Sequence, residues 1–285
     1  MMACAFDSSG STAGGLDGTE GHATHESSST VGHATSADDT ITTGASHDGS
    51  TSGPAETSNT DDGRDDTGSS SDTDEDAPML WCDREDLDLV ACYDFEDIGT
   101  GMLFDGSAHG NDGTIEGVTV VASPLGQAVV FDQASRVAVP DSPSLDLTFE
   151  MTLEVWLRVD ALPTSGRMGV LDNDGQYSIF LYAGDGLRCS GSGHSLFHQP
   201  VPTSKWMHVA CVVGDDMHRM YVDGELVGET SFHGPMQTGN TNPMAIGDDS
   251  PAFDQPLAGA IAGVRIWSRP LARAELCAAA SVDCR

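Results

Sequence analysis

Residues 206–227 read WMHVACVVGDDMHRMYVDGELV and contain the strongest signals of secondary structure in the chain. In the first part of this stretch, apolar side chains recur with the period of a half-buried β-strand, at Met207, Val209, Cys211 and Val213. In its second part, Asp223-Gly224 stands between two apolar pairs, and Asp-Gly so placed is the strongest short signal of a β-hairpin. The stretch therefore predicts antiparallel strands joined by tight turns.

A second run with the same period lies at residues 152–159 (TLEVWLRV). Its apolar members, predicted to share the face that meets the core, are Leu153, Val155, Leu157 and Val159. Glu150 and Glu154 fall on the other face, and we predict that both are solvated.

Strand-like runs recur after Pro78, and Gly, Asp, Asn or Pro interrupts them every 8–12 residues. Residues 271–280 (LARAELCAAA) are the one stretch that predicts a helix. Many short strands without intervening helices are typical of a sandwich or jelly roll and not of a parallel α/β sheet. The predicted fold class is all-β, a sandwich of two antiparallel sheets.

The 285 residues divide into two unlike parts. Residues 1–78 are rich in Ser, Thr, Gly and Asp, and no aromatic residue lies between Phe6 and Trp81. Such a segment cannot bury enough apolar surface to offset about 1–2 kcal/mol of backbone entropy per residue. We predict a disordered tether over residues 1–78 and a folded domain over residues 79–285.

The charge balance excludes two classes of function. The chain has 12 basic and 45 acidic residues and a net charge of −33, so phosphate backbones would repel it and no nucleic acid is expected as a partner. The folded part keeps 29 acidic and 11 basic residues. No apolar run approaches the roughly 18 residues of a membrane span.

Four segments between residues 93 and 283 resemble the laminin G-like, concanavalin A-like jelly-roll family of lectin and adhesion modules, in its bacterial secreted form. They are YDFE at 93–96, DGSAHGNDGT at 105–114, WMHVA at 206–210 with YVDG at 221–224, and GVRIWSRPL at 263–271. Each segment alone is a weak signal, but four in the family's order indicate the fold strongly. The resemblance implies a concanavalin A-like sandwich and a role in recognition.

Six of the seven cysteines lie in the folded part, an even number that suits disulfides and an oxidising compartment outside the cytoplasm. Six cysteines allow 15 pairings, and no Cys-x2-Cys spacing favours a metal site. The fold that the resemblance implies makes Cys189 with Cys211 a plausible pair across strands. It also brings the first and last segments together, and with them Cys82, Cys92, Cys277 and Cys284.

The seventh cysteine, Cys4, follows Met-Met-Ala, which resembles the end of a bacterial lipobox. Three residues cannot form the basic and apolar regions of a signal peptide. Either the true start lies upstream and Cys4 is lipidated, or this cysteine is incidental. A lipid anchor would be the sole contact with a membrane. The expected location is outside the cytoplasm, as a cell-surface protein, an outer-membrane lipoprotein or a secreted protein.

Aromatic residues supply both core and ligand-contact candidates. Trp156, Trp206 and Trp267 lie in three separate predicted strands, and we expect them to pack in the core because each buries a large apolar area. The residues on or near predicted loops are better candidates for ligand contact: Tyr177, Tyr182, His194 and His198.

Calcium is the candidate cofactor, because related modules often bind one ion near the first loop. Asp105, Asn111 and Asp112 occupy the matching positions, and their oxygens are of the kind that calcium prefers. The acidic residue that the family usually carries after the Ile of its closing strand is missing, because Ala262 follows Ile261. Asp172-Asn173-Asp174-Gly175 is interpreted as a turn rather than an ion site.

No catalytic motif stands out in the chain. The paired carboxylates of glycoside hydrolases with this fold, in the pattern E-x-D-x-x-E, do not occur. The sequence therefore favours a non-enzymatic extracellular or cell-surface module that binds a glycan or a protein. The alternatives are a glycan-active hydrolase of the same fold and a structural envelope component without a ligand.

Overall fold

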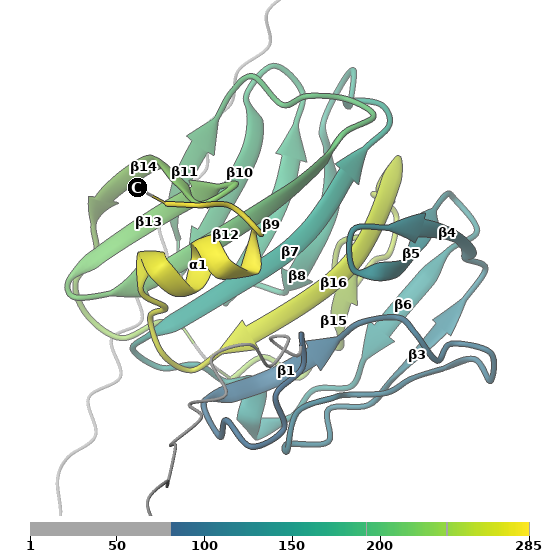
Figure 1. The fold of residues 1–285 in the computed structure, drawn as a ribbon, viewed down its shortest axis with the longest axis horizontal. Helices are drawn as coiled ribbons and strands as arrows, with labels where there is room; N and C mark the ends of the chain where they lie inside the picture. The colour runs from purple at the N-terminus through teal and green to yellow at the C-terminus, as the bar shows by residue number, and fades with distance from the viewer. Residues whose placement is uncertain (1–80, 192, 238, 285) are drawn as a thin grey trace, which may run out of the picture. The chain divides into compact units, whose positions relative to one another are not determined.

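The computed structural model describes residues 81–191, 193–237 and 239–284 (Figure 1). The predicted tether at residues 1–78 and the candidate lipidation site Cys4 lie outside the described residues. Among the described residues, one α-helix and one short 3-10 turn accompany 16 β-strands. The all-β prediction is confirmed.

The strands form two antiparallel sheets that pack as two layers (Figure 1). The first sheet has the order β14 (Glu225–Ser231), β13 (Met217–Val222), β12 (Trp206–Gly214), β7 (Met151–Val159), β16 (Gly259–Trp267), β5 (Gly126–Phe131) and β4 (Thr119–Ser123), and β1 (Leu89–Tyr93) also pairs with β16. The second has the order β11 (His194–His198), β10 (Gly186–Gly191), β9 (Tyr177–Tyr182), β8 (Arg167–Asn173), β15 (Met244–Ile246), β6 (Arg136–Val139), β3 (Gly113–Glu116) and β2 (Met102–Leu103).

The hairpin predicted at Asp223-Gly224 joins β13 to β14, and Val222 pairs with Glu225. Both turn residues have positive φ, 49° and 74°, as this kind of turn requires. Gly224 is needed for a second reason. A Cβ there would lie 3.0 Å from the sulfur of Cys277 and 3.0 Å from that of Cys284.

The core lies between the sheets and contains both predicted apolar rows. The inward side chains of β7 and β12 are all buried: Leu153, Val155, Leu157, Val159, Met207, Val209, Cys211 and Val213. Burying one such aliphatic side chain stabilises a fold by about 1.5–3 kcal/mol. The period-2 pattern therefore identified the core face correctly.

The prediction that Glu154 is solvated is wrong. The outer face of the first sheet is covered by α1 (Arg273–Ala279) and by the segment that begins at Trp81, so Glu154 is 0% exposed (Figure 1). Glu150 is exposed and precedes β7. Trp156 and Trp267 are buried as predicted and Trp206 only partly, but all three lie in this outer layer rather than between the sheets.

The helix predicted over residues 271–280 is observed as α1, within one or two residues at each end. Its first turn is capped by Glu275, whose carboxylate accepts a hydrogen bond of 2.7 Å from the N–H of Ala272. Leu276 anchors the helix in a cluster with Ala210, Val212 and Trp267.

Three disulfides pair the six cysteines, with Cα atoms 5.6 to 6.0 Å apart. Cys189 joins Cys211, the pair that the sequence favours, and so links β10 of the second sheet to β12 of the first. The remaining four, which the sequence left open, pair within their own ends of the chain as Cys82–Cys92 and Cys277–Cys284.

Candidate functional site

The candidate site is the outer face of the second sheet, over β8, β9 and β10. Side chains alternate along β9, so Ser178, Phe180 and Tyr182 point away from the core. Residues paired across the strands share this face in three rows. The rows are Asp172 with Ser178 and Ser190, Gly169 with Phe180 and Arg188, and Arg167 with Tyr182 and Gly186.

Two arginines hold the hydroxyl of Tyr182 from opposite sides. Nη1 of Arg188 donates to it at 2.7 Å and Nη1 of Arg167 at 3.4 Å. Arg167 also lies 4.1 Å above the ring of Phe180, a cation–π contact that covers this ring. The network fixes Tyr182 on the sheet before any ligand arrives.

Phe197 of β11 extends the aromatic surface. Its ring lies 6.2 Å from that of Tyr182 in an edge-to-face arrangement, and the residue is 49% exposed. The rings of Tyr182 and Phe197 thus form one aromatic patch beside Arg188, and such a patch is a candidate for ligand contact.

A cavity of about 300 Å³ opens beside these rows, and its lining includes Asp172, Ser178, Arg188 and Ser250. The loop after β15 forms one wall, because it lies directly against β8: a Cβ at Gly169 would fall 2.0 Å from the carbonyl oxygen of Asp248. Tyr182 lines a second hollow of about 200 Å³ with Leu162 and Pro200.

Asp172 is the most perturbed acid of this face. Burial raises its pKa to about 7, against the lowering effects of a hydrogen bond from the backbone N–H of Ser250 and of the charge on Arg167. The carboxylates of Asp174 and Asp249 raise it further. Near neutral pH this side chain is therefore partly protonated and can donate as well as accept a hydrogen bond.

The four predicted ligand contacts separate in the structure, and Tyr182 alone lies on the candidate face. Tyr177 is among the residues that line the cavity. Its side chain is 2% exposed and its hydroxyl donates to the carbonyl of Leu145, so ligand contact by this ring stays a prediction. His194 lies on the other face of β11, with its ring 5.0 Å from that of Phe232. His198 shares that face and lines a separate hollow with Arg273.

Four residues of this face were not predicted from the sequence: Arg167, Phe180, Arg188 and Asp172. The alternation of Ser178, Phe180 and Tyr182 in the run YSIFLY was a usable signal. Asp172-Asn173 ends β8, and the turn predicted there begins at Asp174. Asp172 is thus a strand residue on the site face.

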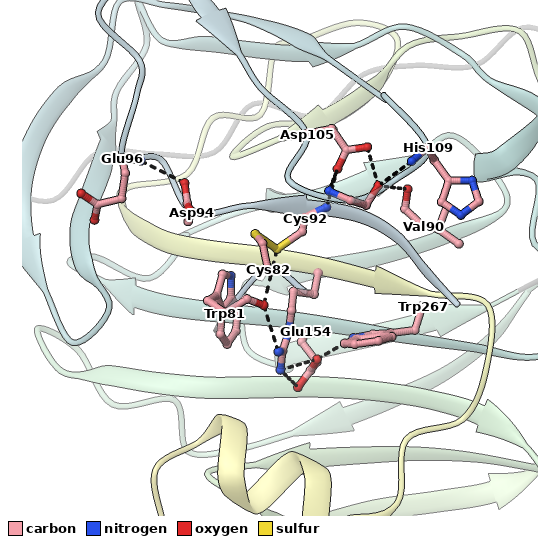
Figure 2. Close-up of a disulfide and its surroundings, with 12 residues drawn as sticks. Trp81, Cys82, Val90, Cys92, Asp94, Glu96, Asp105, His109, Glu154 and Trp267 are labelled. Atoms are coloured by element: carbon pink, nitrogen blue, oxygen red, sulfur yellow. Dashed lines mark hydrogen bonds and ion pairs between the residues drawn. A yellow bond between two sulfur atoms is a disulfide. The ribbon is translucent and has the colours of Figure 1, made fainter. Parts of the chain in front are cut away.

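The three candidate calcium ligands lie together in the loop after β2, and Figure 2 shows Asp105 beside Cys92. Both carboxylate oxygens of Asp105 are already used. Oδ1 accepts from the N–H groups of Cys92 and Ser107, and Oδ2 accepts from Asn111 N–H and from the hydroxyl of Ser107. Asp112 in turn accepts from the N–H of Asp105.

The side-chain amide of Asn111 is used in the same way, because it donates to the carbonyl of Val90 and accepts from Ser144. These atoms organise the loop, and the arrangement does not fit a calcium ion without rearrangement. In the described part of the chain no group of three or more His, Cys, Asp or Glu side chains is placed to hold a metal. Calcium binding at this loop stays a prediction.

Glu154 is the centre of a second polar cluster, under α1 (Figure 2). It accepts hydrogen bonds from Arg265 at 2.9 Å, from Trp267 Nε1 at 2.8 Å and from His208 Nε2 at 3.2 Å. Burial alone raises the pKa of Glu154, but the charge of Arg265 and the hydrogen bond from His208 lower it to about 2. The cluster is closed to solvent and holds the covering layer in place.

The fold and this face can be compared with known proteins. Residues 131–277, more than half of the chain, match the family described as the concanavalin A-like lectin/glucanases superfamily. The chain belongs to this superfamily, which confirms the resemblance seen in the sequence. No curated protein matches the chain.

Solved structures show the same fold at low identity. Domain 4 of AbnA, an extracellular GH43 arabinanase from Geobacillus stearothermophilus solved with arabinotriose, is 22% identical with a TM-score of 0.52, over 66% of this chain and 96% of that one. The binding domain of Paraclostridial Mosquitocidal Protein 1 is 16% identical with a TM-score of 0.56, over 68% of this chain and 52% of that one.

Trypanosoma rangeli sialidase, solved with a difluoro-KDN ligand, is 18% identical with a TM-score of 0.51. The match covers 68% of this chain and 32% of the sialidase, so the present chain spans about a third of that enzyme. These neighbours include a binding domain and glycoside hydrolases. Among the described residues, no helix is long and apolar enough to cross a membrane.

Proposed function

We propose that this domain is a non-enzymatic carbohydrate-recognition module that works outside the cytoplasm and binds a glycan on the outer face of its second sheet. The observation that carries the proposal is the fixed aromatic surface of Tyr182 and Phe197, held by two arginines beside a cavity lined with hydroxyl groups. Sugar rings offer apolar faces to aromatic side chains and hydroxyls to polar ones.

Two hollows border this surface, one lined by Arg167 and Arg188 and the other by Tyr182. A ligand that spans both would cross the width of several strands, each about 4.8 Å from the next. This geometry supports an oligosaccharide of at least two units as the ligand. The arabinotriose complex of the Geobacillus domain agrees with a ligand of this class.

Three disulfides support a location outside the cytoplasm, where such bonds persist. Lipidation of Cys4 would fix that location at a membrane. Expression of the gene with its upstream region, followed by detergent partitioning of the product and of a Cys4→Ala variant, tests the anchor. A difference between the two forms supports the lipoprotein, and equal partitioning contradicts it.

The test of the main proposal is a glycan array probed with the full chain, with and without calcium. Tyr182→Ala and Phe197→Ala should weaken binding by about 3- to 10-fold, as expected for loss of about 0.5–1.5 kcal/mol per aromatic contact. Phe149→Ala is the matched control, because this exposed phenylalanine lies outside the site. Binding that survives both site variants would place the ligand elsewhere.

One observation supports the alternative function as a hydrolase. Asp172, whose pKa is raised, and Asp174 line the same cavity, and glycoside hydrolases use two carboxyl groups. Incubating the full chain with each glycan bound on the array, and measuring new reducing ends, separates the two functions. Cleavage that Asp172→Asn abolishes would replace the binding module with an enzyme.

A further inference from the structure

The candidate cavity is lined by Arg188, whose contacts among the described residues are with uncharged side chains. Nε of Arg188 donates to Ser195 Oγ at 2.9 Å, and Nη1 donates to the hydroxyl of Tyr182. Its guanidinium also lies 5.3 Å from the ring centre of Tyr182 and 5.9 Å from that of Phe197. No ion pair joins Arg188 to a carboxylate in the described part of the chain.

Arg167 on the same face differs in this respect. It lies 3.6 Å from the carboxylate of Asp249 and donates through Nε to Gln255. Its charge is therefore balanced within the protein, while that of Arg188 is not. The contrast is notable because the folded part has 29 acidic residues against 11 basic ones, so carboxylates are abundant.

The geometry leaves one side of the Arg188 guanidinium available. A guanidinium has five N–H donors in a planar fork, and the two bonds to Ser195 and Tyr182 use one on Nε and one on Nη1. The donors left over are one N–H on Nη1 and two on Nη2, and charge-assisted hydrogen bonds from such groups to a carboxylate are strong. Arg188 lines the cavity, so a carboxylate on a ligand bound there can accept from these groups.

Asp172 and Asp174 also line this cavity, but among the described residues no ion pair joins either of them to Arg188. Asp172 and Arg188 lie on β8 and β10, with β9 between them, which sets their backbones about 10 Å apart. Asp172 is faced by Arg167 and by the backbone N–H of Ser250, and Asp174 and Asp249 are the acids that act on it. Its raised pKa keeps much of its negative charge off the cavity near neutral pH.

We infer that the site selects an acidic glycan, and that Arg188 binds the carboxylate of a uronic or sialic acid unit while Tyr182 and Phe197 contact the ring of a neighbouring unit. This inference rests on the proposed glycan-binding function and narrows its ligand class. A single guanidinium without a charged partner suits a ligand that carries one carboxylate per sugar.

The experiment is an array of oligosaccharides containing uronic or sialic acids, each printed as the free acid and as its methyl ester, together with sulfated and neutral glycans. The full chain should bind at least one free acid tenfold or more above its ester. Arg188→Gln should lose that difference, and Arg188→Lys should keep part of it because the charge remains. Arg84→Gln, an equal change of charge at an exposed position outside the cavity, should bind as the unaltered chain does.

The outcomes distinguish the assignment of Arg188 to a carboxylate from the proposed glycan binding. The carboxylate assignment is overturned if the free acid and its methyl ester bind equally, or if sulfated glycans bind as well as the free acids. Glycan binding at this face still stands in that case if Tyr182→Ala weakens it. Binding to no glycan overturns both. Should Arg188→Gln fail to fold, as judged by thermal unfolding, the acid-against-ester ratio of the unaltered chain and of Arg188→Lys decides the question.

Discussion

Glu154 and Arg265 form an ion pair of 2.8 Å that is almost completely shielded from solvent, on the side of the first sheet that faces away from the core between the sheets. The pair lies beneath Trp81, whose ring is 3.9 Å from the guanidinium and whose carbonyl accepts from it. The pair thus ties β7 and β16 to the segment carrying the Cys82–Cys92 disulfide (Figure 2).

Replacing Arg265 with methionine should destabilise the domain strongly, because Glu154 would keep a buried charge without its cation. Breaking a buried pair in this way typically costs about 3–5 kcal/mol. Urea unfolding followed by tryptophan fluorescence measures the change. Arg158→Met is the control, since the Arg158–Asp160 pair is partly exposed and its loss should cost less than about 1 kcal/mol. Equal losses in the two variants would contradict the role of the buried pair.

Acid should unfold the domain through Glu154. Its folded pKa of about 2 lies below its ordinary value of 4.5, so its contribution to stability is present above pH 4.5 and is lost as the pH falls toward 2. The shift corresponds to roughly 3 kcal/mol. Unfolding midpoints measured between pH 7 and pH 2 should fall steeply, and Glu154→Gln should flatten this dependence while lowering stability at pH 7. An unchanged slope in the variant would assign the acid sensitivity to other groups.

Asp172 should have the opposite effect on the pH dependence of stability. Its folded pKa of about 7 lies above the ordinary 3.8, so ionisation opposes folding, and the penalty grows as the pH rises from about 4 to 7. Asp172→Asn should therefore stabilise the domain at pH 8, by up to a few kcal/mol at about 1.4 kcal/mol per pKa unit, and much less at pH 4. Asp185→Asn, at an exposed turn, is the control. A gain in stability over the unaltered chain that is no larger at pH 8 than at pH 4 contradicts the assignment.

Gly169→Ala should disturb the wall of the cavity. Its Cβ would lie 2.0 Å from the carbonyl oxygen of Asp248, so the loop that carries Asp248 and Ser250 must move away from β8. We expect a loss of stability of about 1–3 kcal/mol, as for other overpacked sites, and weaker glycan binding. Gly99→Ala is the matched control because no atom lies within 4 Å of a Cβ there. If Gly169→Ala unfolds and binds glycan as the unaltered chain does, the loop can move at no cost in free energy and the prediction is contradicted.

The Cys189–Cys211 disulfide joins the two sheets, so its removal should be costly. The double variant Cys189→Ala/Cys211→Ala should lose about 2–5 kcal/mol in urea unfolding. Mass mapping of the non-reduced chain checks the three pairings directly. Free thiols in protein recovered from its natural compartment would contradict the location outside the cytoplasm.

The fold class, the core face and the main hairpin could all be predicted from the sequence. These follow from local rules: the period of two in residues 152–159 and 207–213 selects the face that meets the core, and Asp223-Gly224 adopts the positive φ values of a tight turn. The run LARAELCAAA likewise predicted α1, because helix formers and Glu275 stand where a helix begins.

What covers the other faces depends on contacts between segments that lie far apart in the chain. The period of two places Glu154 opposite Leu153 and Val155, but α1 and Trp81, which bury it, come from the two ends of the domain. The same holds for the candidate site. Arg167, Tyr182 and Arg188 meet because β8, β9 and β10 pair in one register, and Asp172 has a raised pKa because a loop some 75 residues further along the chain covers it. Burial and strand register are long-range properties, and they convert ordinary surface residue types into a site.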